Sequence, residues 1–258
     1  MRFCSGISLV NTSPKLSILI ATYNAGKTLE ACLTSVAAQS FKDYEILIAD
    51  GLSNDDTVSI IEKHRNLIKY WHSKRDDGIY DAWNSLINKS TAEYICFIGA
   101  DDIFTNSEAL QSIFQQASDA DFDLITSKGL LLGATREHVF GASWDYCKLA
   151  RRITVCHPGL MHNRKLFEKF GNFDTSYRIV GDYEFLLRLP SDTRVLHVDA
   201  ITVKVADGGV SRSRYMEMLK EKRRAQSECK RIGPLIAWLN FFDKLWRIPI
   251  AKALKIPF

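Results

Sequence analysis

Residues Lys15–Asn24, KLSILIATYN, join a run of apolar residues to a polar end, and the stretch that follows, AGKTLEACLTSVAAQS, repeats apolar residues at helical spacing. The first stretch predicts a buried β-strand and the second a helix. The pattern recurs as YEILIADG before NDDTVSIIEKH, LIKYWHS before GIYDAWNSLINKS, and YICFIGADD before NSEALQSIFQQAS. This alternation predicts an α/β fold with a mostly parallel, Rossmann-like sheet that helices cover on both faces.

From about Asp121 to Asp207 the regular alternation stops. Short apolar segments there predict strands in DLITSKGLLLG, HVF, RRITVCH, RVLHV and ITVKVA, and helical pieces are expected around Arg164–Phe170 and Tyr183–Arg188. No linker rich in Pro, Gly or Ser separates this region from the first one. We therefore expect one domain over residues 1–211, with a first half at about 15–120 and a second half at about 121–211.

The charge of the chain changes at about residue 212. The whole chain has a net charge of +4, but residues 212–258 carry twelve Lys and Arg against four acids, which makes this tail +8 and the rest −4. Apolar residues with amphipathic spacing follow in the tail: Leu235, Trp238, Leu239, Phe242, Leu245 and Trp246. A basic amphipathic helical tail predicts contact with an anionic membrane surface. Packing of the same stripe on the domain or on a partner chain is the alternative.

Composition and cysteine usage restrict the class of protein. The chain is 46% hydrophobic and 25% charged, as in soluble globular proteins, and its six cysteines occur singly, without the spacing of a zinc site. It has no apolar run of membrane-spanning length, and the apolar segment in its first residues is too short for a secretory signal. We expect a cytoplasmic protein held peripherally at the inner face of the cell membrane. Nucleic acid is not an expected partner, and oligomer formation stays open.

Polar residues gather where the predicted strands end. They are Thr22, Tyr23, Asn24, Asp50, Asp76, Asp77, Asp101 and Asp102. In open α/β sheets ligands bind beyond these ends, and several carboxylates at one edge require a cation or hydrogen-bond donors among them. Hard oxygen ligands suit Mg²⁺ or Mn²⁺. Since the chain has neither a GxGxxG motif nor a P-loop, the pattern predicts a nucleoside diphosphate held through a divalent metal.

Each candidate also has a structural explanation. Asp50 and Asp182 stand where an aspartate caps a helix, the pair Asp101–Asp102 could simply end a strand in a turn, and His157 could pack beneath the turn at Pro158. Local sequence alone does not decide between these alternatives.

Five segments, in order, resemble the bacterial glycosyltransferases of family 2 that build polysaccharides such as O-antigen or capsule. They are SILIATYNAGKTLEACLTSVAAQS, EILIADGLSNDDT, DDGIYDAWNSLINKSTAEYICFIGADD, HPGLMHNRKLFEKFGNFDTSYRIVGDYEFLLRL and VADGGVS, which together span about Leu16 to Arg214. The resemblance implies a GT-A fold and a metal-dependent, inverting transfer of a sugar from a nucleotide-sugar donor, with a UDP-sugar favoured, to a glycan or lipid-linked acceptor. It makes the first half of the domain the nucleotide-sugar half and the second the acceptor half.

The resemblance also implies roles for single residues. Thr22 and Tyr23 belong to the nucleobase pocket, and Asn24 belongs to the nucleotide-sugar site. Asp50 reads the base, and Asp77 and Gly78 line the ribose and diphosphate. Asp101 binds the metal and the donor with Asp102 in support, Asp182 is the catalytic base, and His157 and Glu184 lie on the acceptor side. Glu184 is also the rival base.

The sequence departs from the family pattern at two glycines. Gly99 stands where many relatives have an aspartate, and Gly181 stands where an acid often precedes the catalytic aspartate. Two other functions were weighed. A sugar nucleotidyltransferase is disfavoured because no Gly-rich basic loop follows the first strand, and a non-catalytic nucleotide-binding scaffold is disfavoured because Asp101 and Asp182 are both present.

Overall fold

Strands and helices alternate through the first half of the chain, as the hydrophobic pattern predicts. The computed structural model describes residues 13–117, 120–133, 137–206 and 209–254. The elements of the first half are β1 (Leu16–Thr22), α1 (Leu29–Ala37), β2 (Tyr44–Asp50), α2 (Thr57–Lys63), the 3-10 helix η1 (Arg65–Leu67), β3 (Tyr70–Ser73), α3 (Ile79–Ile87), β4 (Tyr94–Gly99), β5 (Ile103–Phe104) and α4 (Ala109–Gln116).

The second half differs from the expected strands at two points. Its elements are β6 (Leu124–Leu132), β7 (Glu137–Phe140), α5 (Tyr146–Leu149), β8 (Met161–Asn163), α6 (Lys165–Phe170), α7 (Gly181–Arg188) and β9 (Val195–Ala206). RVLHV and ITVKVA form the single strand β9, whose register with β6 shifts near Lys128. The strand expected in RRITVCH is wrong, because residues 151–157 are irregular. Near the start of this segment, the carbonyl oxygens of Ala150 and Arg151 bond to side chains of a later helix instead of a neighbouring strand.

The strands form one mixed sheet. Their order is β3-β2-β1-β4-β8-β6-β9-β5, with β7 beside β6. The strands β3, β2, β1 and β4 are mutually parallel, whereas β8 runs antiparallel to β4 and β6. The parallel register pairs Thr22 with Asp50, Asp50 with Ser73, and Ala21 with Gly99. The carboxyl ends of these four strands therefore lie at one edge of the sheet.

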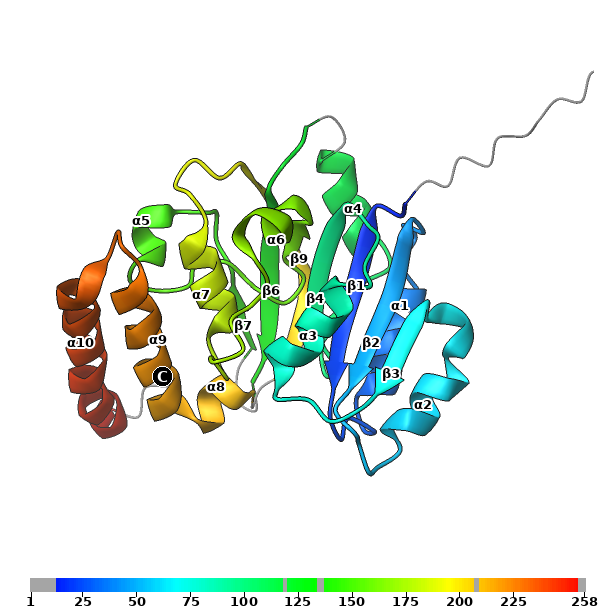
Figure 1. The fold of residues 1–258 in the computed structure, drawn as a ribbon, viewed down its shortest axis with the longest axis horizontal. Helices are drawn as coiled ribbons and strands as arrows, with labels where there is room; N and C mark the ends of the chain where they lie inside the picture. Colours follow the sequence, from blue (N-terminus) through cyan, green and yellow to red (C-terminus); the bar gives the residue numbers. More distant parts are fainter. Residues whose placement is uncertain (1–12, 118–119, 134–136, 207–208, 255–258) are drawn as a thin grey trace, which may run out of the picture.

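Helices cover both faces of this sheet (Figure 1). Leu19 of β1 belongs to a core that includes Trp83 of α3. Ile18 and Ile20, on the opposite face of β1, pack in a second core with Leu33 of α1. Since successive residues of a strand point to opposite faces, a strand buried on both sides needs an uninterrupted apolar run, and β1 has one from Ile18 to Ala21.

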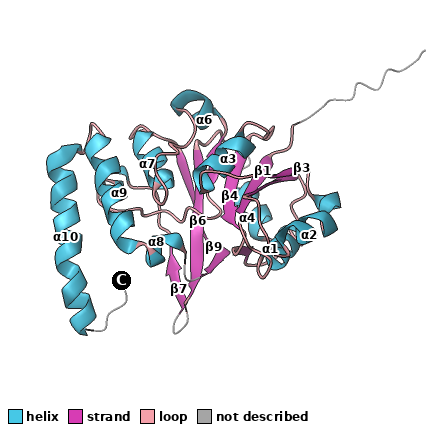
Figure 2. Cartoon of the chain, turned by 60° about the horizontal axis from the view of Figure 1, so that its bottom comes forward, coloured by secondary structure: helices cyan, strands magenta, loops and turns pink. Residues whose placement is uncertain are grey.

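Three helices follow β9: α8 (Val210–Ser213), α9 (Tyr215–Glu228) and α10 (Gly233–Leu254). Helices α9 and α10 lie side by side at the end of the molecule away from β3 (Figures 1 and 2). Ala225 of α9 is buried in the same core as α3 and α7. The boundary expected near residue 211 therefore does not coincide with a break in packing.

The described part of the chain contains no helix that is both long and apolar enough to cross a membrane. The last residues of the expected tail, 255–258, lie outside the described residues.

Candidate active site

The carboxyl end of β2 places Asp50 between its neighbours in the sheet. Its carboxylate is fully buried and accepts hydrogen bonds from Thr22 Oγ1 (3.0 Å), Ser73 Oγ (2.6 Å), and the backbone N–H and Oγ of Ser53 (3.0 and 2.5 Å). Burial acts to raise the pKa of Asp50, but these donors outweigh it and leave the pKa lowered. Asp50 thus fixes the loop after β2, and a direct contact with a nucleobase would require one of these donors to move.

Exposed side chains surround this buried pair of Thr22 and Asp50. Tyr23 is 68% exposed and lies against Gly51, at which a Cβ would stand 3.3 Å from the Tyr23 ring. Asn24 (φ 49°) and the exposed Leu52 (φ 67°) both adopt the left-handed backbone conformation. An aromatic ring and an aliphatic side chain exposed at this edge can receive the flat face of a nucleobase.

Two aspartates follow β4, one exposed and one buried. Asp101 faces solvent, whereas Asp102 is 5% exposed and its Oδ2 accepts a hydrogen bond from Gly99 N–H at 2.8 Å. Burial raises the pKa of Asp102 to about 6, and the neighbouring charge of Asp101 adds to the effect. A cation bound beside the pair would favour the ionised form of Asp102.

Gly99 allows these two carboxylates to approach each other. A Cβ at this position would lie 2.7 Å from Asp101 Oδ1 and 3.0 Å from Asp102 Oδ2, so any side chain here would displace both. Two hard oxygen donors near one point fit Mg²⁺ or Mn²⁺, which proteins hold through one or two carboxylates while phosphates and water complete the coordination. Among the described residues, no group of three or more His, Cys, Asp or Glu side chains forms a metal cage.

The loop after β3 turns sharply into α3. Asp76 Oδ1 accepts a hydrogen bond from Gly78 N–H at 2.9 Å, and Asp77 is exposed. Gly78 has a φ of 110°, and a Cβ on it would lie 3.2 Å from Nη1 of Arg178. An arginine from the second half of the domain therefore lies over this loop, and a guanidinium is well suited to bind phosphate oxygens.

Asp182 lies in the first turn of α7, within reach of Tyr80 from α3. The Tyr80 hydroxyl donates a hydrogen bond to Asp182 Oδ1 at 3.0 Å, and the Asp182 side chain is 20% exposed. Burial raises the pKa of Asp182, while hydrogen bonds from Tyr183 N–H and from the Tyr80 hydroxyl act in the opposite direction. A partly exposed carboxylate with a raised pKa is suited to accept a proton near neutral pH.

Gly181 makes the contact between Tyr80 and Asp182 possible. A Cβ on Gly181 would lie 2.9 Å from carbon atoms of the Tyr80 ring. An acidic side chain at position 181 would therefore displace Tyr80. The hydroxyl of Tyr80 reaches Asp182 across the space that such an acid would need.

His157 is a buried neighbour of Asp182. It is 7% exposed, stacks on Phe97 with ring centroids 5.9 Å apart, and its Nδ1 lies 3.9 Å from Asp182 Oδ2. Burial lowers the pKa of His157 to about 4, so the ring is neutral at neutral pH and this contact is no ion pair. His157 therefore shapes the surroundings of Asp182 without adding charge.

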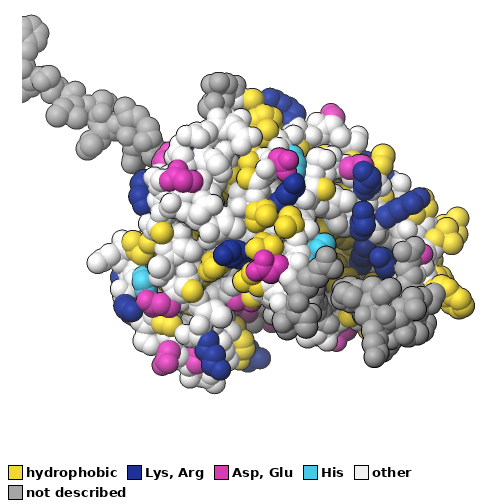
Figure 3. All heavy atoms as spheres, turned by 180° about the vertical axis from the view of Figure 1, so that it is seen from behind, with side chains coloured by type: hydrophobic (Ala, Val, Ile, Leu, Met, Phe, Trp, Pro, Cys, Tyr) yellow, Lys and Arg dark blue, Asp and Glu magenta, His cyan; other side chains and the backbone are white. Residues whose placement is uncertain are grey.

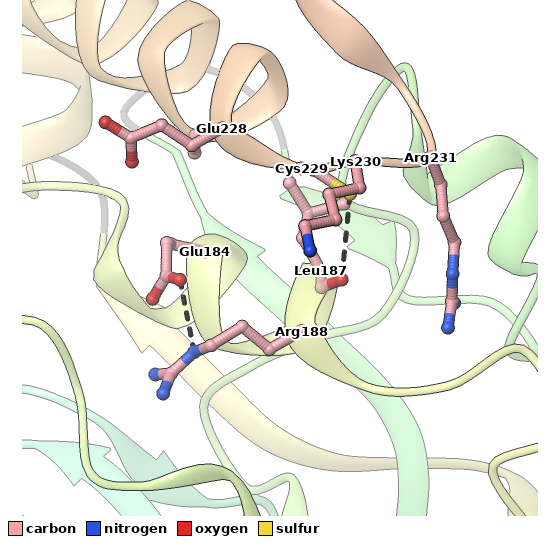
Figure 4. A pocket seen from close by; sticks show the side chains of 8 residues that line it. Glu184, Leu187, Arg188, Glu228, Cys229, Lys230 and Arg231 are labelled. Atoms are coloured by element: carbon pink, nitrogen blue, oxygen red, sulfur yellow. Dashed lines mark hydrogen bonds and ion pairs between the residues drawn. The ribbon is translucent and has the colours of Figure 1, made fainter.

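Glu184 faces a different cavity from Asp182. In Figure 4 its carboxylate points toward Arg188, and the distance from Arg188 Nε to Glu184 Oε1 is 3.1 Å. This pocket lies between α7 and α9 and is also lined by Glu228 and Arg231. Residues two apart on a helix do not face one another, and here the structure separates Glu184 from the surroundings of Asp182.

The cavity beside Asp182 has a volume of about 330 Å³. Ile153 of the irregular segment and Val180 before α7 line it, and α9 contributes Met218 and Lys222. A helix from the predicted tail therefore forms one wall of the cavity that contains the candidate base.

Helix α9 also holds the start of α7 in place. Glu221 accepts three backbone hydrogen bonds, from the N–H groups of Arg178 (2.9 Å), Ile179 (2.9 Å) and Val180 (3.1 Å). The N–H groups at a helix start have no partner within the helix, and a negative charge there is favourable. Glu221 thus fixes the segment that leads directly into Asp182.

Comparison with known proteins shows which family this chain resembles. A family model described as Glycosyl transferase family 2 matches residues 17–131, which contain the ends of β1, β2, β3 and β4. A PGL/p-HBAD biosynthesis glycosyltransferase of Mycobacterium tuberculosis is 29% identical over 196 residues, which cover 72% of this chain and 75% of that protein. This chain is therefore similar to glycosyltransferases of family 2.

Solved structures resemble this chain in fold. TarS of S. aureus in complex with UDP-GlcNAc matches with a TM-score of 0.65 at 17% identity, over 90% of this chain and 71% of that one. The mannosyltransferase PcManGT of Pyrobaculum calidifontis, in complex with GDP-Man and Mn²⁺, matches with a TM-score of 0.68 at 16% identity, over 94% and 74%. The expected α/β class and GT-A fold are confirmed.

The sequence alone did not single out Tyr80, Arg178, Glu221 and Lys222. The contact between Tyr80 and Asp182 joins residues 102 positions apart, and no local pattern announces it. Glu221 did carry a signal, because it is one of few acids in a strongly basic segment. An isolated acid in such a segment can mark a specific contact within the protein.

Proposed function

We propose that this chain is a glycosyltransferase that transfers a sugar from a nucleotide-sugar donor, with a UDP-sugar favoured, to a hydroxyl of a glycan or lipid-linked acceptor in cell-surface polysaccharide assembly. The observation that carries the proposal is Asp182, a partly exposed carboxylate with a raised pKa beside a cavity. The relatives support the donor and the setting, since one is named for PGL/p-HBAD biosynthesis and TarS was solved with UDP-GlcNAc.

The transfer proceeds by a single displacement. A sugar hydroxyl is a weak nucleophile at neutral pH, so a positioned base must take its proton as the new bond forms. Tyr80 holds Oδ1 of Asp182, which leaves Oδ2 for the acceptor hydroxyl. The hydroxyl oxygen bonds to the anomeric carbon, the proton passes to Asp182, and the bond from that carbon to the diphosphate breaks. One displacement inverts the anomeric configuration.

The acidic pair after β4 would hold a divalent metal, Mn²⁺ or Mg²⁺. Asp101 and Asp102 converge near Gly99, and PcManGT was solved with Mn²⁺. When bound, the metal stabilises the charge that develops on the departing diphosphate. Arg178, which lies beside Gly78 at the start of α3, would add a second cation for the phosphate oxygens.

The exposure of single side chains suggests how the rest of the donor site is built. Tyr23 and Leu52 would contact the nucleobase, because both are exposed at the edge where the parallel strands end. The buried Thr22 and Asp50 form the floor beneath them. Asn24, together with Asp77 and Gly78 of the β3 loop, would line the remaining part of the nucleotide.

Helix α10 would hold the enzyme at the cytoplasmic face of a membrane. Its exposed apolar side chains are Leu235 (73% exposed), Leu239 (61%), Phe242 (56%) and Trp246 (75%). Their spacing places them on one face of the helix, and exposed Trp and Phe beside cations suit the headgroup boundary. A chain that ends at Ile232 keeps α9 and lacks this face. It should lose binding to anionic vesicles while it keeps nucleotide binding.

An assay of released products tests the reaction class. Purified protein with Mn²⁺ and a panel of nucleotide sugars should release a nucleoside diphosphate when an acceptor is supplied. Release of pyrophosphate would instead indicate a nucleotidyltransferase. Release of neither product with any donor would favour a binding protein without catalysis.

A further inference from the structure

A second, basic groove lies between α5 and α10. Its volume is about 580 Å³. Four cationic side chains line it, together with the carboxylate of Asp243: Lys148, Arg151, Arg152 and Lys244. Ile236 and Leu239 of α10 add apolar surface to the same groove. The view of Figure 3, from behind, shows Lys and Arg side chains gathered on the side of the molecule where α10 lies.

Hydrogen bonds from two helices hold the wall of this groove in place. Ala150 O accepts from Gln226 Nε2 (2.9 Å) and Asn240 Nδ2 (3.2 Å), and Arg151 O accepts from Lys222 Nζ (2.7 Å). The backbone that carries Arg151 is therefore tied to both α9 and α10. These hydrogen bonds fix the backbone wall of the groove within the fold.

The positive charge of the groove is only partly compensated. Lys148 pairs with Asp145 at 2.9 Å. Within the described part of the chain, no ion pair joins Arg151, Arg152 or Lys244 to a carboxylate. Burial, with the charges of Lys244 and Arg152 adding to it, lowers the pKa of the neighbouring Lys222 to about 8. The groove therefore offers guanidinium and ammonium groups to an anion.

We propose that this groove binds the phosphate headgroup of an anionic membrane lipid. Arginine presents a planar set of donors that matches phosphate oxygens. Ile236 and Leu239 continue from the cations toward the exposed apolar face of α10, so one ligand with a phosphate and a hydrocarbon chain fits both surfaces.

The groove adjoins the cavity that contains Asp182. Lys222 lines that cavity and donates to the carbonyl oxygen of Arg151 at the groove. A lipid whose phosphate occupies the groove would carry its attached sugar toward the candidate base. This identification of the lipid as the acceptor carrier rests on the proposed function, whereas the phosphate site itself does not.

Vesicle binding by matched variants tests the site. The double variant Arg151→Ala/Arg152→Ala removes two cations from the groove. Lys42→Ala/Lys63→Ala removes two cations beside α1 and α2, at the other end of the molecule (Figure 1). Full-length proteins are mixed with vesicles of phosphatidylcholine alone or phosphatidylcholine with phosphatidylglycerol, and inorganic pyrophosphate serves as the soluble competitor. A thermal shift with UDP and Mn²⁺ confirms that each variant is folded.

The groove variant should bind the phosphatidylglycerol vesicles about 30-fold more weakly than the wild type, since each cation near an anionic surface adds about 1 kcal/mol. The control variant should bind like the wild type, and pyrophosphate should compete only when the arginines are present. Equal vesicle binding by both variants would overturn the proposal. Pyrophosphate binding without any vesicle binding would assign the groove to a soluble phosphate and also overturn it. Vesicle binding through the groove without nucleoside diphosphate release would refute the proposed function alone.

Discussion

The proposed donor site at the carboxyl ends of β1, β2, β3 and β4 and the surroundings of Asp182 are built in different ways. At the proposed donor site, polar residues come from loops that directly follow parallel strands, and Asp50 receives its hydrogen bonds from strand neighbours and its own loop. Around Asp182, the partners come from distant parts of the chain, namely Tyr80 of α3 and Glu221 of α9, which acts through the backbone before α7.

This difference has a chemical consequence. The saturated hydrogen bonds of Asp50 keep it ionised and fixed, which suits a preformed binding surface. Asp182 is ionised less readily because its side chain is largely buried and has fewer donors, which suits a group that must take up a proton during the reaction. The predictions below change one region and leave the other intact, and they run from the largest expected effect on turnover to the smallest.

Loss of Asp101, the proposed metal ligand, should have the largest effect. Asp101→Ala, or chelation by EDTA, should abolish turnover, because the departing diphosphate would lose its stabilising cation. The measurement is nucleoside diphosphate release with and without added Mn²⁺. Asp43→Ala, an exposed aspartate before β2, is the control and should behave like the wild type. Full activity of Asp101→Ala in the presence of chelator would show that turnover does not require a metal held by Asp101.

Loss of the base should slow the reaction without weakening the donor site. Asp182→Asn keeps the shape of the side chain but cannot accept the proton, so kcat should fall on the order of 10²–10⁴-fold while UDP binding is unchanged. Glu184→Gln is the matched control, since Glu184 lines another pocket and pairs with Arg188. If Glu184→Gln lost activity while Asp182→Asn stayed active, Glu184 and not Asp182 would be the base.

Loss of the anchor on α9 should have a smaller effect on turnover. Glu221→Ala leaves three backbone N–H groups before α7 without their acceptor. It should lower the free energy of unfolding by about 2 kcal/mol and kcat by roughly tenfold through displacement of Asp182. Glu217→Ala, on the same helix but paired only with Arg214 among described residues, is the control. Unchanged kcat with reduced stability would limit Glu221 to a structural role.

The strands and helices around the proposed donor site could be predicted from the sequence because their hydrophobic patterns are local. Each strand of the parallel set is an apolar run bounded by polar residues, and the buried positions of α1, Leu29, Cys32, Leu33 and Val36, repeat at helical spacing. The burial of Asp50 was not foreseen, since its donors Thr22 and Ser73 come from neighbouring strands.

The structure around Asp182 could be predicted from the sequence only in part. The apolar residues of RRITVCH suggested a strand, but side-chain donors from α9 take the carbonyl oxygens at its start. Charge suggested a separate tail after residue 211, yet α9 packs in the core and lines the Asp182 cavity. Contacts between residues so far apart leave no periodic pattern in the sequence.

The two glycine departures have one physical explanation. Gly99 leaves room for the carboxylates of Asp101 and Asp102, and Gly181 leaves room for the ring of Tyr80. The resemblance to the family marks each position as one where an acidic residue is common. In the structure, each glycine instead permits a close approach by a neighbouring side chain.

The pH dependence of kcat/KM in the wild type and in Tyr80→Phe is the most direct test that Asp182 is the base and that Tyr80 tunes it. The hydrogen bond from Tyr80 lowers the pKa of Asp182, so its loss raises that pKa further. Since the base must be ionised, activity in the wild type should fall as the pH drops through the raised pKa of Asp182. In Tyr80→Phe this acid limb should move to higher pH, with little change in the plateau rate. An acid limb at the same pH in both enzymes, or one that moves to lower pH, would contradict the account.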